Sequence, residues 1–504
     1  MDTQAETGAP SSEDVSLQAM TRRALSRPDG DIAIEFENRA ISWSDMRLVA
    51  EKLFALMAKS GADPRAPVTL IARNRPSAIA ALLALTAEGR TIRMVYPFQS
   101  GAGIARALEQ RPSAIVIAAA QDFSEPVLEA ARKLGMAALA IEDMDAHALP
   151  GLERAGAETE TFDKPRIEIL TSGTTGPPKA FPISYEMAAK DLVLPAMPSD
   201  PSADTRPPPL LIFPVGNISG LYTTLPAMLA FGRAILLDRF NARDWRDYIV
   251  RFGIEHSGMP PAGVQMVMEA GIPKDDLKSL KSLSTGAAPL DPSVHRAFEA
   301  HYGVPILLSY GATEFGGPVT MMTPALHARW GDEKFGTVGV ARPGAKLRVV
   351  DPETGAELPP NTEGVLEVVS PRIGPDWIRT SDLALIDEDG FVFHKGRADC
   401  AIMRGGFKVL PETIERALML HEAVSAAGVV GAPDKRLGQV PAAAVQLKPG
   451  ASKPSFAELE AHLRDHVLAH HIPVYWLILD ELPRTPSMKV DRPALNQLFK
   501  TESR

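Results

Sequence analysis

Along the first half of the chain, segments whose apolar residues have helical spacing alternate with short continuous apolar runs. Apolar residues follow helical spacing between positions 46 and 57. Short apolar runs at 68–72 and 114–120 predict buried strands, and the patterns at 77–87 and 125–134 predict the helices that follow them. Repeated alternation of strand and helix predicts parallel sheets with helices packed on their faces.

The pattern changes twice in the second half of the chain. From residue 337 to residue 393, short strands and turns predominate, which predicts a small β-rich subdomain. After Gly396 and Arg397 a new strand–helix pattern begins, and residues 411–420 predict a strong helix.

These patterns predict an α/β fold with two main domains. We expect residues 15–396 to form a large amino-terminal nucleotide- and acyl-binding domain of two helix-flanked, mostly parallel sheets plus the β-rich subdomain. Residues 397–504 would then form a small, mobile α+β lid domain. Residues 1–14 are polar and are expected to be a disordered lead-in.

Composition narrows the classes of function. The chain has 504 residues, 45% hydrophobic and 23% charged, which is typical of a soluble globular protein too long for one ordinary core. Its 53 basic and 62 acidic residues give a net charge of −9, which argues against broad nucleic-acid binding. The only cysteine, Cys400, cannot form an internal disulfide, so we expect a cytoplasmic location. We expect no membrane partner, and a homodimer is left open.

A loop rich in glycine and hydroxyl groups follows the apolar run 167–170. Residues 171–179 read Thr-Ser-Gly-Thr-Thr-Gly-Pro-Pro-Lys. Two glycines allow the backbone to approach a ligand, hydroxyls and amides can donate to phosphate oxygens, and Lys179 adds positive charge. Ala180 follows Lys179, so this is not a Walker loop. The expected phosphate-binding residues are Thr171, Ser172, Gly173, Thr174, Thr175, Gly176 and Lys179.

This loop resembles that of the acyl-adenylate-forming superfamily: acyl- and aryl-CoA ligases, peptide-synthetase adenylation domains and firefly-type luciferases. Further matching segments follow in order from about Arg27 to Leu495, and the chain is most similar to a class I acyl-CoA ligase. The resemblance implies that ATP, Mg²⁺ and coenzyme A are used. It also implies an acyl-adenylate made in one half-reaction and consumed in a second, after the lid domain rotates.

The resemblance assigns roles in the middle of the chain. Gly286, Ala287 and Ala288 match a turn beside adenine. In the segment 310–314 the aromatic ring would pack on adenine, the threonine would lie by the phosphates and the glutamate would bind Mg²⁺, which prefers oxygen ligands. The residues in this segment are Tyr310, Gly311, Ala312, Thr313 and Glu314.

Further roles fall in the last quarter of the chain. By resemblance, Asp382 accepts hydrogen bonds from both ribose hydroxyls, Arg397 contacts the nucleotide and Asp399 is the hinge. A loop bordering the coenzyme A tunnel matches Gly405, Gly406, Phe407 and Lys408. Lys489 is the expected catalytic lysine, because an ammonium group stabilises two anions forced together when a carboxylate attacks a phosphate.

Four residues depart from the family's pattern. Asn217 stands where ligases commonly carry histidine or another aromatic, so gating of the thiol tunnel is expected to differ. Ala180 replaces a glycine, which is a mild change, and Ser381 replaces another, which is tolerable if its backbone angle is ordinary. Met488 replaces the glycine before Lys489, which would cost roughly 1–2 kcal/mol if that position were left-handed.

The expected acyl pocket consists of small or apolar residues. No basic residue stands out to recognise a second charge on the substrate, so a neutral hydrophobic acid is favoured, whether aromatic, alicyclic or medium-chain. The glycines either leave room for a bulky ring or serve turns. The pocket residues are Asn217, Ile218, Ser219, Gly220, Ser309, Phe315, Gly316 and Gly317.

The sequence therefore predicts an ATP-dependent, AMP-forming carboxylic acid:CoA ligase. One alternative is a stand-alone adenylation enzyme that loads a separate carrier protein. Another, from a different class, is a non-catalytic nucleotide-binding protein on the same scaffold; retention of Lys489 argues against it, because binding alone does not need that lysine. A luciferase-like oxygenase is the third alternative.

Overall fold

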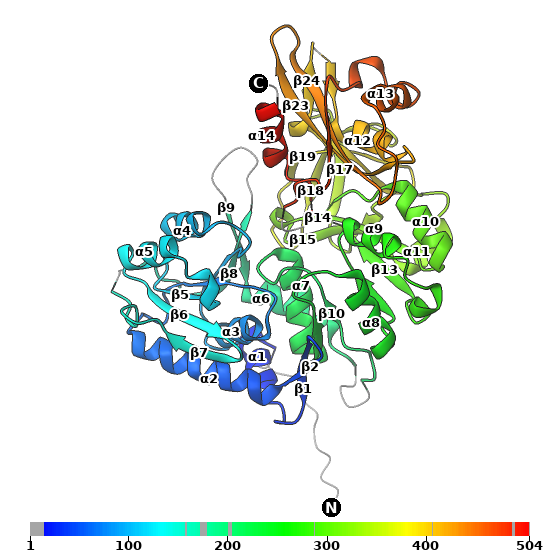
Figure 1. Cartoon of the computed structure of the whole chain (residues 1–504). Helices are drawn as coiled ribbons and strands as arrows, with labels where there is room; N and C mark the ends of the chain where they lie inside the picture. Colours follow the sequence, from blue (N-terminus) through cyan, green and yellow to red (C-terminus); the bar gives the residue numbers. More distant parts are fainter. Residues whose placement is uncertain are drawn as a thin grey trace, which may run out of the picture. The chain divides into compact units, whose positions relative to one another are not determined.

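A computed structural model describes residues 15–156, 159–171, 179–199, 204–286, 288–405, 407–485 and 489–502. The chain divides into two compact units, Met1–Ser257 and Gly258–Arg504, and each unit is considered by itself (Figure 1). Within the described residues, no helix combines the length and the apolar character needed to cross a membrane.

The largest sheet of the first unit has seven strands in the order β7-β6-β5-β3-β4-β8-β9. Its five inner strands are parallel, whereas β7 and β9 pair antiparallel at the two edges. The strands are β3 (Val68–Ile71), β4 (Ile92–Val95), β5 (Ile115–Ala118), β6 (Ala137–Glu142), β7 (Asp145–Ala148), β8 (Arg166–Thr171) and β9 (Lys179–Ser184). The strands expected over 68–72 and 114–120 are β3 and β5.

Helices cover both faces of this sheet (Figure 1). Alternate residues of β5 face opposite sides: Ile115 and Ile117 pack with α2 and α3, while Val116 and Ala118 pack with α4 and α5. The helix α2 begins with a capping box formed by Ser42 and ends before a left-handed glycine. These helices are α2 (Trp43–Ser60), α3 (Pro76–Ala87), α4 (Gly101–Gln110) and α5 (Glu125–Lys133).

A second sheet of the first unit has the order β10-β11-β1-β2. The pairs β10·β11 and β1·β11 are parallel, and β1·β2 is antiparallel. Its strands are β1 (Ile32–Phe36), β2 (Arg39–Ser42), β10 (Leu210–Leu211) and β11 (Ala234–Leu236). The remaining long helices of this unit are α1 (Leu17–Leu25), α7 (Ile218–Pro226) and α8 (Ala242–Phe252).

The first part of the second unit contains two sheets. In the first, β13 and β14 are parallel, and β14, β15 and β16 pair antiparallel. The second is the antiparallel sheet β17-β18-β19-β20, which corresponds to the predicted β-rich subdomain. The strands are β13 (Ser282–Thr285), β14 (Ile306–Ala312), β15 (Gly317–Met321), β16 (Val340–Ala341), β17 (Lys346–Val350), β18 (Gly364–Val369), β19 (Ile378–Ile386) and β20 (Val392–Arg397). The helices are α9 (Pro261–Glu269), α10 (Pro292–Tyr302) and α11 (Pro324–Trp330).

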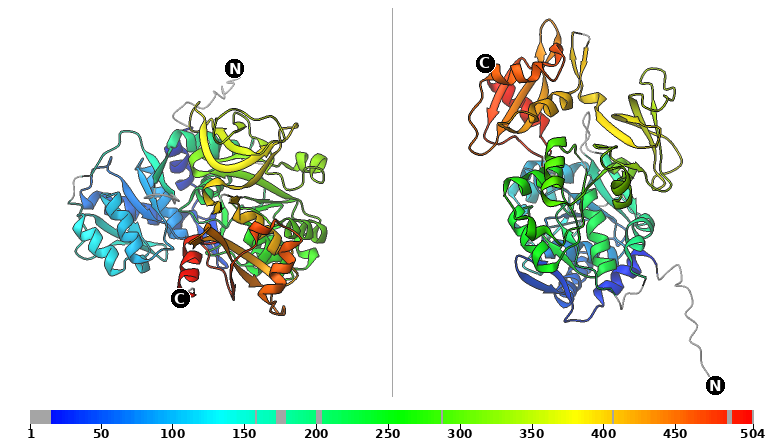
Figure 2. Two further views of the ribbon diagram at one scale, coloured as in Figure 1. Left: turned by 90° about the horizontal axis from the view of Figure 1, so that it is seen from above. Right: turned by 90° about the vertical axis from the view of Figure 1, so that its right-hand side faces the viewer.

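The carboxy-terminal part of the second unit has its own sheet, of order β22-β21-β24-β23, with β25 added parallel to β24. Figure 2 shows it in orange and red, distinct from the yellow sheet β17–β20. Separate apolar clusters cover its two faces. Its elements are β21 (Ile402–Arg404), β22 (Phe407–Val409), α12 (Pro411–Met419), β23 (Val424–Asp434), β24 (Gly438–Leu447), α13 (Phe456–Arg464), β25 (Tyr475–Leu479) and α14 (Arg492–Glu502). The helix expected over 411–420 is α12.

Candidate functional site

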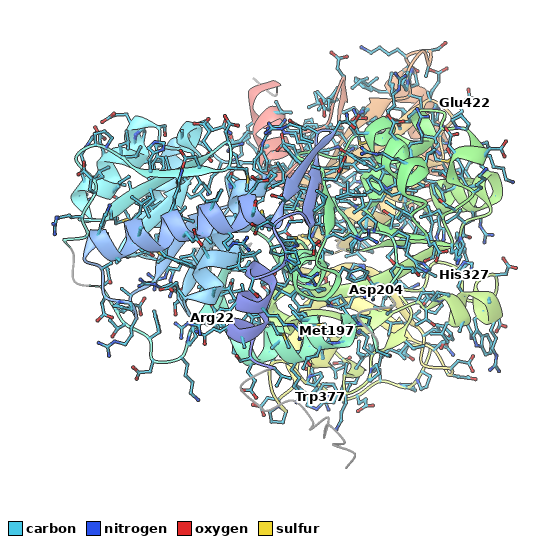
Figure 3. The ribbon with its side chains drawn as sticks, turned by 90° about the horizontal axis from the view of Figure 1, so that it is seen from below. Arg22, Met197, Asp204, His327, Trp377 and Glu422 are labelled. Atoms are coloured by element: carbon cyan, nitrogen blue, oxygen red, sulfur yellow. The ribbon has the colours of Figure 1, made fainter. Side chains whose placement is uncertain are left out.

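The site in the second unit is built on the ladder between β19 and β20. Asp382 of β19 lies directly opposite Arg397 of β20. Residues opposite one another in an antiparallel pair share a face of the sheet, with Cβ atoms about 4.5–5.5 Å apart. The ladder therefore places two of the expected nucleotide-binding residues side by side. The segment leading to Asp382 starts at the surface with Trp377, which is labelled in Figure 3. The guanidinium carbon of Arg348 lies 4.2 Å from the centre of the Trp377 ring.

Both carboxylate oxygens of Asp382 have partners. The Tyr310 hydroxyl donates to Oδ2 over 2.5 Å, and Nε2 of His394 lies 3.3 Å from Oδ1. The rings of Tyr310 and His394 stack, with centroids 5.7 Å apart and planes 30° apart. Burial raises the pKa of Asp382, but hydrogen bonds from His394 and Tyr310, together with the charges of His394 and Arg397, outweigh it and lower the pKa overall. Asp382 is thus held as an ionised acceptor.

Tyr310 comes from β14, in the neighbouring sheet, and its ring also lies 6.0 Å from that of Phe315. Burial, followed by the negative charge of Asp382, raises the pKa of the Tyr310 hydroxyl, which keeps its proton. The residue expected to pack on adenine is therefore also tied to the residue expected to bind ribose. The sequence motif gave no sign of this link.

Arg397 is held in place by two side chains. Its Nε and Nη2 atoms donate to the two oxygens of Asp399 over 2.8 and 2.6 Å, and Nη2 also donates to the Ser381 hydroxyl over 2.6 Å. The hydrogen bond from Arg397 lowers the pKa of Asp399 to about 2. Ser381, one of the departures from the family pattern, thus supplies an acceptor that a glycine could not.

Lys489 lies at the end of a tight backbone turn. The amide of Thr485 donates to the Lys489 carbonyl over 2.7 Å, and the Lys489 amide donates to the Thr485 hydroxyl over 3.2 Å. Arg484 and Val490, the residues on either side of this pair, form an isolated antiparallel β-bridge. These bonds fix the backbone at Lys489. Residues 486–488, including Met488, lie outside the described part of the chain.

The charge environment of Lys489 connects it with the rest of the site. The residue is exposed to solvent, yet surrounding protein atoms lower the pKa of its ammonium group, as does the positive charge of Arg397. The carboxylates of Asp382 and Glu314 act in the opposite direction and raise it. Lys489 therefore lies within electrostatic reach of three expected site residues that come from three other segments.

Glu314 lies in a short 3₁₀ turn, Thr313–Phe315, directly after β14. It is exposed, and its carboxylate forms no hydrogen bond or ion pair with any described residue. In the same described ranges, no group of three or more His, Cys, Asp or Glu side chains could hold a metal ion. A single free carboxylate fits a Mg²⁺ ion that takes its other ligands from substrate phosphates and water.

In the second unit, several glycines at the expected adenine- and acyl-binding positions are required by the backbone geometry around them. A Cβ at Gly311 would lie 2.5 Å from the Gly317 carbonyl oxygen, and one at Gly286 would lie 2.7 Å from the Ser309 hydroxyl. Gly316 and Gly317 have φ angles of 65° and 108°, which disfavour other residues. The glycines serve turns and close contacts, so they give no measure of pocket size. Ala288 is partly buried, and Ala287 lies outside the described residues.

In the first unit, Asn217 is the amino-terminal cap of α7. Its side-chain oxygen accepts from the Gly220 amide over 2.7 Å. A Cβ at Gly220 would lie 1.9 Å from the Pro214 carbonyl oxygen, so only glycine fits here. Ile218 and Ser219 form the first turn of this helix. The cap gives Asn217 a local role that its comparison with histidine-bearing ligases had not indicated.

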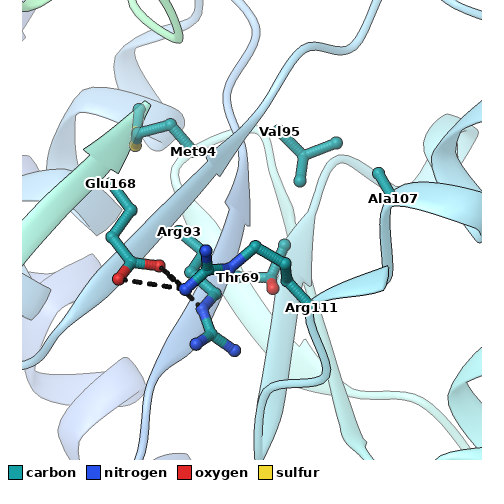
Figure 4. A pocket seen from close by; sticks show the side chains of 7 residues that line it. All are labelled: Thr69, Arg93, Met94, Val95, Ala107, Arg111 and Glu168. Atoms are coloured by element: carbon teal, nitrogen blue, oxygen red, sulfur yellow. Dashed lines mark hydrogen bonds and ion pairs between the residues drawn. The ribbon is translucent and has the colours of Figure 1, made fainter. Parts of the chain in front are cut away.

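The expected phosphate loop joins β8 to β9. Thr171 and Lys179 are opposite one another in that antiparallel pair, while residues 172–178 (including Ser172, Gly173, Thr174, Thr175 and Gly176) lie outside the described part, as do the side chains of Thr171 and Lys179. Glu168 anchors β8 by ion pairs to three arginines, Arg93, Arg111 and Arg166, and Figure 4 shows the first two around a small pocket.

The loop expected to border the coenzyme A tunnel is the turn between β21 and β22. Gly405 has a φ of 57°, and its amide donates to the Leu437 carbonyl over 2.8 Å. Phe407 is 59% exposed, and its ring stacks on His470 with centroids 4.7 Å apart. Gly406 and the side chain of Lys408 lie outside the described residues.

Comparisons with known proteins agree with these observations. The family described as AMP-binding enzyme matches residues 20–375, and the AMP-binding enzyme C-terminal domain matches residues 413–489. A fatty acid–[acyl-carrier-protein] ligase, ScoC of Streptomyces coeruleorubidus, is 30% identical over 67% of this chain and 68% of that protein. The indoleacetate–CoA ligase of Aromatoleum aromaticum is 27% identical over 93% of this chain and 95% of that protein. The structure of ATP-bound MatB from Rhodopseudomonas palustris aligns with a TM-score of 0.80 at 24% identity, covering 97% of this chain and 100% of that one.

Proposed function

Because the chain belongs to the AMP-binding enzyme family, we propose that it converts a neutral hydrophobic carboxylic acid into its coenzyme A thioester through an acyl-adenylate. The acid is aromatic, alicyclic or medium-chain. Asp382 accepts from the ribose hydroxyls, Arg397 contacts the nucleotide and Lys489 stabilises the negative charge that builds up when the carboxylate attacks the α-phosphate.

Family membership confirms several predictions made from the sequence. The resemblance to acyl-adenylate-forming enzymes is confirmed, as is the α/β fold with a large amino-terminal and a smaller carboxy-terminal domain. The chain is an AMP-forming acid–thiol ligase, and enzymes of this kind use ATP, Mg²⁺ and coenzyme A. The boundary at residue 396 and the individual site roles remain predictions.

The proposed mechanism is supported by the electrostatic environment of Lys489, because the charges of Arg397, Asp382 and Glu314 all act on the pKa of its ammonium group. Attack of one anion on another needs a positive charge held where the two meet. The turn at Thr485 and Lys489 holds the backbone from which that charge extends, since two hydrogen bonds join the Lys489 carbonyl and amide to Thr485. When bound, Mg²⁺ neutralises phosphate charge, and Glu314, whose carboxylate forms no hydrogen bond or ion pair with any described residue, would bind it.

The proposed acid class rests on the expected pocket residues. Those of the second unit, Ser309 and 315–317, offer no charged side chain to pair with a second carboxylate or an amino group of the substrate. The relatives named for indoleacetate and for fatty acids act on acids of this hydrophobic kind.

The acceptor is the second part of the proposal. Coenzyme A is favoured over a carrier protein because the indoleacetate–CoA ligase matches over nearly the whole of both chains. The carrier-protein ligase matches over about two thirds of each, and it supports a separate carrier as the alternative acceptor.

A panel of carboxylic acids, assayed for AMP release with and without coenzyme A, tests both parts. We expect indoleacetate, cinnamate-type and medium-chain acids to release AMP at a rate that rises when coenzyme A is added, and diacids and amino acids to release little. AMP release that depends on the acid but is unaffected by coenzyme A, and that rises with an acyl carrier protein, would support the alternative. No acid-dependent AMP release would contradict the proposal.

A further inference from the structure

We infer that His394 is a positioning residue for the nucleotide: it holds the Asp382 carboxylate in the orientation that receives the ribose hydroxyls. The inference rests on the proposed function. It concerns a residue that the sequence motifs did not single out and that lies between the ribose segment and the expected hinge.

The hydrogen bond between these residues has one possible direction. Asp382 is ionised, because the net effect of its surroundings is to lower its pKa, so both carboxylate oxygens can only accept. Nε2 of His394, 3.3 Å from Oδ1, must therefore carry the proton and donate it. Both side chains are largely enclosed, with exposed fractions of 20% for His394 and 14% for Asp382, which limits competition from water.

The carboxylate keeps enough acceptor capacity for a sugar. Two carboxylate oxygens offer about four acceptor sites in total. Tyr310 uses one site on Oδ2 and His394 uses one on Oδ1, which leaves one site on each oxygen. Two neighbouring hydroxyls of a ribose match two acceptor sites on one fixed carboxylate. Fixing the carboxylate before binding lowers the entropic cost of recognition.

A β-bulge places His394 in this position. Asp382 pairs with Arg397 and Leu383 with Gly396, but Ala384 pairs with His394, so the register skips Lys395. In a regular strand, residues 394 and 397 would point to opposite faces, because side chains alternate. The extra residue brings His394 and Arg397 to the same face as Asp382. The stack on Tyr310 then fixes the ring of His394.

Two variants separate hydrogen bonding from packing. His394→Phe keeps a ring against Tyr310 but removes the donor, whereas His394→Gln keeps an N–H donor without the ring. Binding of ATP and of 2′,3′-dideoxy-ATP, which lacks both ribose hydroxyls, is measured by calorimetry on the full chain with Mg²⁺. His327→Phe serves as the control, because His327 (labelled in Figure 3) also contacts a carboxylate. Its Nε2 lies 2.9 Å from Glu299 on α10, outside this ladder.

We expect His394→Phe to weaken ATP binding about tenfold, the loss typical of a hydrogen bond to a charged group, and to raise the KM for ATP more than it lowers kcat. Binding of the dideoxy analogue should be unchanged, His394→Gln should recover most of the loss, and the control should bind like the wild type. Equal loss for ATP and the analogue, or no loss for either, would overturn the positioning role while leaving the proposed function intact. A wild-type protein that binds no ATP would overturn both.

Discussion

Arg397 and Asp399 form a two-bond ion pair across a single intervening residue, with donor–acceptor distances of 2.8 and 2.6 Å. One partner is expected to contact the nucleotide, and the other is expected to be the hinge of the lid domain. The lowered pKa of Asp399, about 2, means that the pair is intact at neutral pH. Its stabilising contribution is fully present above the carboxylate's ordinary pKa of 3.8 and is lost as pH falls toward 2. Rotation about residue 399 must therefore rearrange a formed ion pair.

Asp399→Asn tests whether this pair holds the orientation in which Lys489 lies within electrostatic reach of Asp382. Acid-dependent ATP–pyrophosphate exchange should fall, while thioester formation from a synthetic acyl-adenylate should be unchanged or faster. The partly exposed pair should contribute less than about 1 kcal/mol to folding, so the unfolding midpoint should hardly move. Glu460→Gln, which breaks the surface pair with Arg464, is the control and should alter neither half-reaction. An equal fall in both half-reactions would contradict a role in orientation.

Glu168 should matter for stability because it is buried among arginines. Its side chain is 3% exposed and lies 2.9 Å from Nε of Arg93 and 2.7 Å from Nη2 of Arg166. Removing one partner of a buried ion pair leaves uncompensated charge, so Glu168→Leu should lower the free energy of unfolding by about 3–5 kcal/mol in denaturant titration. Glu125→Gln, in the exposed pair with Arg132, should cost less than about 1 kcal/mol.

The same variant has a predicted pH dependence. Burial raises the pKa of Glu168, but hydrogen bonds and charges from its arginine partners lower it further, so the net shift is downward. The stability that Glu168 supplies is present above its ordinary pKa of 4.5 and is lost as pH falls through its lower folded value. The difference between wild type and Glu168→Leu should therefore shrink in acid. A constant difference from neutral pH to strong acid would contradict this assignment.

Glu415 should show the opposite dependence. The Glu415 carboxyl on α12 has a side chain 17% exposed and lies beside Arg492 and Glu412, and its enclosure by protein atoms raises its pKa from 4.5 to about 7. The folded state therefore binds a proton that the unfolded state releases, and the contribution of Glu415 to stability falls as pH rises from 4.5 to about 7. Glu415→Gln cannot lose a proton, so its stability relative to wild type should rise over that range and then level off. Thermal unfolding of both proteins across pH 5–8 measures this, and parallel curves would contradict it.

The regular elements could be predicted from the sequence because their signals are local. The helix α3 and the strand β3 lie within a residue of the expected ranges, since their apolar patterns coincide with complete burial. Asp382 and Arg397 could be named from motifs, and their placement opposite one another follows from the β19–β20 ladder.

The contacts of the site could not be predicted in the same way. His394 reaches Asp382 only because the register skips Lys395, and a one-residue bulge leaves no mark in the hydrophobic pattern. Asparagine is a favoured amino-terminal cap, and Asn217 caps α7. The family pattern indicated only that Asn217 replaces a histidine or another aromatic residue, so the cap was not predicted. The contact of Tyr310 with Asp382 joins two sheets and depends on tertiary packing.

The central claim is that Lys489 acts in forming the adenylate and not in consuming it. The most direct test is to measure both half-reactions of Lys489→Ala, with the exposed Lys500→Ala on α14 as the control. We predict that acid-dependent ATP–pyrophosphate exchange falls at least about 100-fold, as when one fixed charge or donor is removed from a transition state, while thioester formation from a synthetic acyl-adenylate persists. Exchange at the wild-type rate, or loss of both half-reactions together, would contradict the account.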